Sequence, residues 1–109
     1  MQFCRLYTGA DGQSRFEELD HSQASEHFFG VHKVQGLVFK NDYPAHLLGW
    51  HNAPRRQWVI TLAGSVEIGI GDGTTKTFHP GDVFLAEDVT GQGHTAKPDS
   101  WVRAFVHLE

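Results

Sequence analysis

The sequence has a single cysteine, Cys4, among its 109 residues. One thiol cannot close an internal disulfide, and the residues around Cys4 form no redox motif. We therefore expect Cys4 to be a small buried apolar side chain. The chain also lacks a Gly-x-Ser-x-Gly segment, a cysteine paired with histidine for nucleophilic attack and the spacing of a zinc ribbon. Hydrolysis through a covalent nucleophile is therefore unsupported.

Basic residues are also few. The chain has 9 Lys and Arg against 13 Asp and Glu, a formal net charge of −4, and no basic cluster larger than Arg55-Arg56. Because binding to phosphates needs a basic surface, we expect no nucleic-acid partner. No apolar run reaches the roughly 18 residues of a membrane span, and the N-terminus has no basic segment followed by an apolar one. These absences predict a cytoplasmic protein with no membrane partner.

The length predicts one domain, residues 1–109, and a hydrophobic content of 39% is enough for a single core. In the N-terminal region, Phe3 to Tyr7 and Val31 to Lys40 have the composition of strands, and Ser22 to Phe29 has the signals of a short helix. The expected parts of the domain are an N-terminal arm with strands, residues 1–36, and a barrel, residues 37–108.

Alternating runs fill the centre of the chain. The run from Gln57 to Leu62 alternates between two largely apolar faces, as in a β-strand that is covered on both sides. Asp72-Gly73 supplies the positive-φ residues of a tight hairpin, and His79 to Asp82 form a second turn. This pattern predicts an all-β fold with an antiparallel sheet. The expected strands are 57–62, 66–70, 74–78, 83–85 and a closing strand at 101–108.

Two segments resemble the motifs of the cupin superfamily, whose members are small double-sheet β-barrels. The first cupin motif ends with a glutamate, six residues and a glycine. Gln57 and Gly64 match this end, with glutamine in place of glutamate, and His51 takes one of the two histidine positions before it. The second motif begins with Pro-Gly-Asp and a hydrophobic strand, as in Pro80 to Leu85, and closes on a histidine, here His94.

The resemblance covers about residues 37 to 108 and implies a cupin-type double-stranded β-helix, or jelly-roll, barrel. The chain is also similar to a subgroup of small bacterial cupins. These share an Ala-Pro-Arg-Arg-Gln segment, here Ala53 to Gln57, and an Ala-Glu-Asp-x-x-Gly-x-Gly-His segment, here Ala86 to His94. This similarity implies which proteins are related to the chain, but it does not imply a reaction that the chain would catalyse.

The resemblance also implies a metal site. Cupins usually hold Fe, Mn, Ni or Zn with three histidines and a glutamate. The candidate ligands in this chain are His51, Gln57 and His94. Two imidazoles and a neutral amide bring no charge to offset a dication. The alternative is that these residues are the polar lining of a pocket without metal.

The other six histidines are predicted to lie outside this site. His79 precedes a proline in a turn, and we expect it to be exposed. Two further histidines, His46 and His107, are placed to reach the pocket, but neither is predicted to be a ligand. The N-terminal histidines are expected on the surface, namely His21, His27 and His32.

Glu87 and Asp88 are neighbours on a strand, so they point to opposite faces and do not form a paired acid and base. We expect one of them either to face the pocket or to form a salt bridge with Arg55 or Arg56 that fixes the Gly91-Gln92-Gly93 loop. On the first central strand, Trp58 faces outward if Gln57 faces the barrel. A row of apolar side chains on the outside of the barrel must be shielded from water, so we predict that a second copy of the chain packs on it in a homodimer.

Two functions of different classes remain open. The first is a cupin that binds a small molecule in its barrel, with a divalent metal as cofactor, and acts as a dioxygenase or isomerase. The second is a ligand-binding or sensor module without metal or catalysis. The replacement of glutamate by Gln57 favours the second, because it weakens the metal site. A purely structural assembly subunit, with its lumen filled by side chains, is a third reading.

Overall fold

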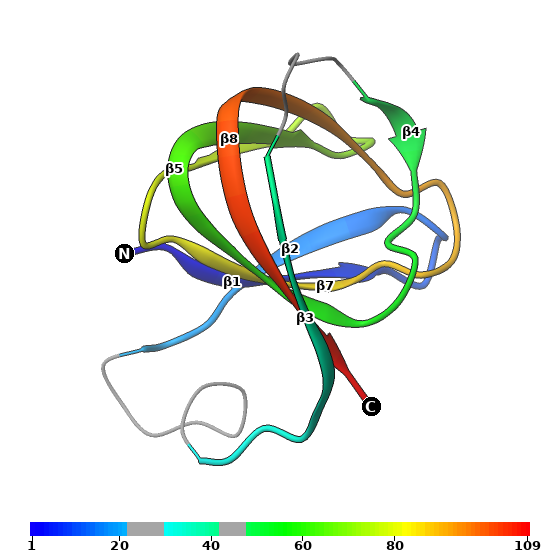
Figure 1. Cartoon of the computed structure of the whole chain (residues 1–109). Coiled ribbons are helices and arrows are strands. Elements are labelled where there is room, and N and C mark those ends of the chain that lie inside the picture. Colours follow the sequence, from blue (N-terminus) through cyan, green and yellow to red (C-terminus); the bar gives the residue numbers. More distant parts are fainter. Residues whose placement is uncertain (22–29, 42–47) are drawn as a thin grey trace.

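The computed structural model describes residues 1–21, 30–41 and 48–109, and over these ranges the fold is all-β, with no helix (Figure 1). The helix predicted at 22–29 lies outside the described residues. No helix in the described ranges is long and apolar enough to span a membrane. The strands are β1 (Phe3–Thr8), β2 (Ser14–Glu18), β3 (Val34–Lys40), β4 (Leu48–His51), β5 (Gln57–Gly69), β6 (Thr75–Phe78), β7 (Val83–Glu87) and β8 (His94–Leu108).

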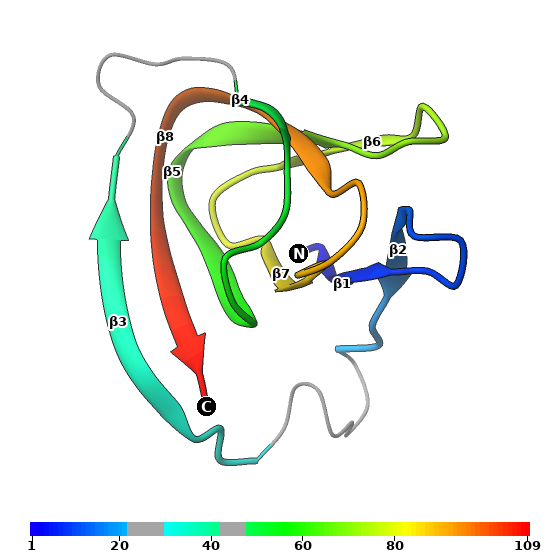
Figure 2. The ribbon, with the colours of Figure 1, turned by 90° about the vertical axis from the view of Figure 1, so that its right-hand side faces the viewer.

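The strands form one curled sheet in the order β2-β1-β7-β5-β8-β3, with β4 paired to β8 and β6 paired to β5. The pair β1 and β7 is parallel, whereas the other pairs are antiparallel. Figure 2 shows β5 and β8 running side by side and curving together, with β3 along the outer side of β8. The sheet therefore closes into a half-barrel. The prediction of an all-β, barrel-like fold is confirmed at this level.

Gly64 is where β5 bends. The sequence pattern separates 57–62 from 66–70, but the structure has one continuous strand whose register with β8 shifts between Thr61 and Ser65. Gly64 has φ of 67°, and a Cβ built on it would lie 2.1 Å from the carbonyl oxygen of Ser100. Only glycine fits that backbone approach. Because of the bend, the first half of β5 pairs with β7 and the second half with β6.

The two turns that connect the central strands lie where the sequence predicts them, but of the Asp72-Gly73 pair only Gly73 has the expected positive φ, at 89°. At the hairpin, the amide of Ile70 donates to the carbonyl of Thr74 at 3.0 Å, and the amide of Gly73 donates back to Ile70 at 3.0 Å. At the second turn, the amide of Asp82 donates to the carbonyl of His79 at 2.9 Å. These turns return the chain so that β6 pairs with the second half of β5 and β7 with its first half.

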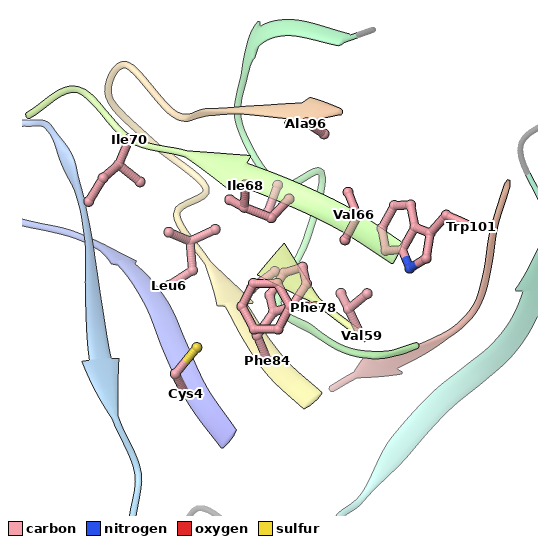
Figure 3. Close-up of a cluster of buried hydrophobic side chains, with 12 residues drawn as sticks. Cys4, Leu6, Val59, Val66, Ile68, Ile70, Phe78, Phe84, Ala96 and Trp101 are labelled. Atoms are coloured by element: carbon pink, nitrogen blue, oxygen red, sulfur yellow. The ribbon is translucent and has the colours of Figure 1, made fainter. Parts of the chain in front are cut away.

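Figure 3 shows the core on the inner face of the half-barrel. Phe78 is fully buried, and its ring lies 4.6 Å from that of Phe84. Cys4 is also fully buried, as predicted, and burial is the main cause that raises the pKa of its thiol to about 12. The apolar core fills this part of the barrel and leaves the cavity described below at the side of β4.

The outer face carries Trp58, opposite in phase to the buried Gln57, as predicted. The cover over Trp58 comes from its own chain. The ring of Phe3 stacks on it at 5.3 Å, and Leu19 joins the same buried cluster. Leu62, further along the same row, is 46% exposed. The outward row on which the homodimer prediction rested is therefore partly covered within one chain.

Candidate functional site

A cavity of about 350 Å³ lies inside the half-barrel. This is at the small end of ligand sites, which span about 300 to 1,000 Å³. All three candidate ligands, His51, Gln57 and His94, line it. The structure therefore brings together residues from β4, β5 and β8. Its main apolar lining residues are Val38, Val59, Ile68, Phe84, Trp101 and Phe105.

His51 and His94 are direct partners across the β4 and β8 ladder. Their rings meet edge to face, with centroids 4.4 Å apart. Gly93 makes this approach possible, because it has φ of 81° and a Cβ there would lie 2.0 Å from the carbonyl oxygen of His51. The first residue of β8 is thus held against the last residue of β4. No sequence pattern predicts β4, which has only four residues and follows a segment outside the described residues.

Asp88 fixes the orientation of His94. Its carboxylate oxygen Oδ2 lies 2.6 Å from Nδ1 of His94 and accepts a second hydrogen bond, of 2.7 Å, from the hydroxyl of Ser14. A carboxylate accepts hydrogen bonds, so Nδ1 of the ring is the donor. This places the lone pair of the neutral ring on Nε2. Asp88 and Ser14 are fully buried, and His94 is 6% exposed.

His51 is held in the same tautomer by the backbone. Its Nδ1 lies 2.7 Å from the carbonyl oxygen of Gly49, which can only accept. Both imidazoles therefore use Nδ1 for anchoring and keep Nε2 for contacts in the cavity. Gln57, the third candidate, is 6% exposed and lies between Ala86 and His107 in the sheet.

Three cationic side chains line the same cavity, namely Lys40, Arg55 and Arg103. Arg103 is 8% exposed, and its guanidinium lies over the ring of Trp101 at 4.2 Å and donates to the carbonyl of Trp101 at 3.2 Å. The ring of Phe105 lies 5.4 Å from the same guanidinium. No aspartate or glutamate lines the cavity in the described part of the chain. The lining is therefore positively charged.

The other histidines lie largely where the sequence places them. His79 is exposed, as is His21. His32 is half-buried, with its ring edge-on to Trp58 at 5.5 Å. His107 lines the cavity, with Nδ1 3.4 Å from Nη1 of Arg55. The predictions for His27 and His46 lie outside the described residues.

Glu87 and Asp88 point to opposite faces, as predicted, and Glu87 forms salt bridges on the outside. It accepts a hydrogen bond of 2.8 Å from Arg5 and one of 2.7 Å from Arg56. Partial burial opposes the ionisation of Glu87. The hydrogen bonds and charges of the two arginines outweigh burial, and the pKa of the carboxyl lies below its ordinary value of 4.5. The pairing with Arg56 is one of the alternatives named above.

The salt bridge does not fix the glycine loop, however. Asn52 does so, because its side-chain amide donates to the carbonyls of Thr90 at 2.9 Å and Gly91 at 3.0 Å. From the other side, the amide of Gln92 donates to the carbonyl of Gly12 at 2.9 Å. An Asn side chain ties two backbone carbonyls at once, which a charge pair on the outer face of β7 cannot do.

We expect Glu87→Gln to destabilise the protein by about 1 kcal/mol at neutral pH, because it removes two partly exposed charge-assisted contacts. A lowered pKa in the folded state contributes stability above the ordinary pKa and loses it as pH falls. The difference between wild type and Glu87→Gln should therefore be full above pH 4.5 and shrink below it. Urea unfolding across pH measures it. A difference that grows towards low pH would contradict the assignment.

The candidate metal ligands fall short of a metal site. The described residues include no group of three or more His, Cys, Asp or Glu side chains that could hold a metal ion. Gln57 adds a neutral oxygen to two imidazoles. The cations Lys40, Arg55 and Arg103 line the same cavity, which adds repulsion towards a dication. These donors therefore do not fit a divalent metal well. The metal prediction stays a prediction.

Comparison with known proteins adds no identity. The sequence matches no protein-family model, and no curated protein matches it.

Proposed function

We propose that the cavity binds a small organic anion that carries an apolar part. The observation that carries this proposal is the charge of the lining. Lys40, Arg55 and Arg103 face one cavity in which the described residues place no carboxylate. The apolar residues that share the lining would contact the rest of the ligand. A ligand site of this kind combines an apolar wall with a few charged groups that fix orientation.

Arg103 is the residue best suited to hold the charge of the ligand. Its guanidinium is buried and lies flat over Trp101, so its side chain loses little freedom when a ligand binds. A planar guanidinium presents paired donors that match the two oxygens of a carboxylate or phosphate. Removal of water from this cavity strengthens the attraction relative to the surface. Lys40 and Arg55, which are exposed, would contribute less each.

We also propose that the half-barrel is a cupin-type jelly roll. The cupin-like motifs support this, and so does the position of their residues. The histidines of the two motifs, His51 and His94, meet across one cavity, as the resemblance implies. The Pro-Gly-Asp segment that begins the second motif forms the turn into β7.

The anion proposal is tested by comparing organic anions with an uncharged compound of similar shape. Thermal unfolding is followed with benzoate, phthalate and phenyl phosphate, and with benzamide as a neutral control of similar shape. Ligand binding stabilises the folded state by about 2.7 kcal/mol at a concentration of 100 times Kd. We expect at least one anion to raise Tm at about 0.15 M salt, where weak surface attraction is screened. If none binds in preference to benzamide, the proposal is wrong.

Charge-removing variants locate the binding. Arg103→Met should abolish the rise in Tm, and Lys40→Met, at an exposed position, should reduce it without affecting folding. Lys97→Met is the matched control, because Lys97 is exposed and does not line the cavity. An equal effect of Lys40→Met and Lys97→Met would show that the anion binds to surface charge in general.

A metal-dependent dioxygenase or isomerase is the second candidate. The anchored imidazoles of His51 and His94 favour it, because metal-binding histidines commonly donate their other nitrogen to a carboxylate or carbonyl. Elemental analysis of protein purified without a tag or chelator tests it, beside the His51→Ala, His94→Ala double variant. Near-stoichiometric metal that is lost in the double variant would establish the metal site.

The homodimer prediction stays open to measurement. Leu37 and Phe39 of the edge strand β3 are 56% and 67% exposed, and Leu62 lies further along the same outer face. Light scattering distinguishes a dimer from the single chain of 12.2 kDa.

A further inference from the structure

His94 has three features of a histidine that takes up a proton. It lines the cavity, its Nδ1 is hydrogen-bonded to the carboxylate of Asp88 at 2.6 Å, and it is 6% exposed. The buried Oδ1 of Asp88 has no hydrogen-bond partner in the described part of the chain. Within that part of the chain the carboxylate is held through Oδ2, by Ser14 and His94. A proton on Nε2 of His94 would create an imidazolium paired with it.

Ser14 holds the carboxylate in place from behind. Its hydroxyl, fully buried on β2, donates to Oδ2 of Asp88 at 2.7 Å. The backbone adds a second anchor, because the amide of Ala53 donates to the carbonyl of Asp88 at 3.1 Å. Two segments thus fix Asp88, and Asp88 in turn fixes one tautomer of His94.

We propose that His94 is a general base that removes a proton from the bound anion, with Asp88 as its positioning residue. The proposal rests on the anion proposal for the identity of the natural ligand. The described lining contains no Ser, Thr, Cys, Tyr, Asp or Glu. The cavity therefore offers imidazoles for proton transfer and no hydroxyl, thiol or carboxylate for covalent attack.

The natural substrate class is an organic anion with a C–H bond next to a carbonyl group. Nε2 of His94 takes the proton, and the electron pair of the C–H bond moves to the carbonyl oxygen as an enolate. The enolate would be stabilised by the cations that line the cavity, Arg103 above all. Return of the proton to a neighbouring carbon completes an isomerisation, and its return to the same carbon completes an epimerisation. No oxidant, reductant or second substrate is needed.

His51 is the partner for the returning proton. Its ring lies 4.4 Å from that of His94, and it is half-buried. Its Nε2 is left for the cavity because Nδ1 is used on Gly49. The proton that His94 removes returns to the substrate from His94 itself, or reaches the second carbon after Nε2 of His51 has accepted it.

The proposed base is tested with nitrobenzisoxazole. This reporter substrate is uncharged, so its binding does not depend on the proposed anion site. A base removes the proton from the ring carbon next to nitrogen. The electron pair of that C–H bond forms the nitrile, and the N–O bond breaks to leave a coloured phenolate. All reactions contain EDTA, so that a bound metal is not the source of the rate. We expect a saturable rate above that of buffer at equal pH.

Variants assign the rate to His94. His94→Gln, which keeps a donor near Asp88, and His94→Ala should each lower kcat by about 100-fold, the range of a positioned general base. Free imidazole should restore the rate of His94→Ala, which a purely structural role would not allow. Asp88→Asn should lower kcat by about tenfold without changing KM, because an amide no longer selects the tautomer. The control His79→Ala, at an exposed turn, should not change the rate.

Equal rates for wild type and His94→Gln would overturn the proposal. So would a loss in His94→Ala that imidazole does not restore. A failure of the anion proposal can be told apart from a failure of the base proposal. The anion proposal is tested by the preference for benzoate over benzamide, whereas the reporter of the base carries no charge. A working base in a cavity without anion preference would keep His94 as the base and change only the substrate class.

Discussion

Gly93→Ala is expected to destabilise the protein by about 3 kcal/mol or more and to abolish anion binding. A residue with a side chain at φ of 81° costs about 1 to 3 kcal/mol. The new Cβ would also lie 2.0 Å from the carbonyl oxygen of His51 and 2.9 Å from the amide of Asn52. β4 must therefore move away from β8, which separates His51 from His94. Urea unfolding and the benzoate assay measure the two effects.

Gly73→Ala is the matched control. Gly73 also has a positive φ, of 89°, but a Cβ there has nothing within 4 Å. This variant should show the conformational cost alone, about 1 kcal/mol, and should bind benzoate like wild type. If the two alanine variants are equally stable, then the close approach of β4 to β8 does not exist as described.

Phe78→Ala is expected to destabilise the protein by about 3 to 5 kcal/mol, the cost of a large cavity in a core. Phe78 is fully buried on β6 and packs against Phe84, with ring centroids 4.6 Å apart. It lies in the cluster that joins β5, β6 and β7. Because a protein of this size has about 5 to 15 kcal/mol of stability in all, we expect a large drop in Tm.

The same change at Phe39 is the control. Phe39 is 67% exposed on β3, so Phe39→Ala should change the free energy of unfolding by less than about 0.5 kcal/mol. Both variants are measured where light scattering gives the mass of a single chain, so that association does not contribute. A loss below 1 kcal/mol for Phe78→Ala, or equal losses for both, would contradict the placement of the core.

The local part of the fold is predictable from the sequence. Alternation of apolar residues and the Asp72-Gly73 turn predict the strands around the hairpin, because both signals act over a few residues. The continuity of β5 through Gly64 is not predictable in this way. A glycine usually ends a strand pattern, and here the backbone of Ser100, far along the chain, requires it. The parallel pairing of β1 with β7 likewise joins segments about 80 residues apart.

The site was predicted in part. The motif resemblance led to His51, Gln57 and His94, and these do line one cavity. The buried partners of His94 were missed, because Ser14 and Asp88 are 74 residues apart and no local pattern connects them. Arg103 could have been found, since it shares the strand phase of Phe105 and His107 at the closing strand. Its significance depends on the cavity, which the sequence does not show.

Anion binding and proton transfer are proposed for different residues of the same cavity. Arg103 and Lys40 line it from β8 and β3, and His51 and His94 line it from β4 and the start of β8. An anion held by the cations would place its other atoms towards the imidazoles. The apolar residues that share the lining would contact the rest of the ligand.

Amide NMR spectra recorded during titration with benzoate, and separately with benzamide, test the central claim most directly. The claim predicts saturable shifts with benzoate that are concentrated at Arg103 to His107 and at His94, all of which lie on β8, and much smaller shifts with benzamide. Loss of these shifts in Arg103→Met would complete the result. Shifts that do not saturate, that scatter over exposed lysines and arginines, or that are equal for the two compounds would contradict an anion site in the barrel.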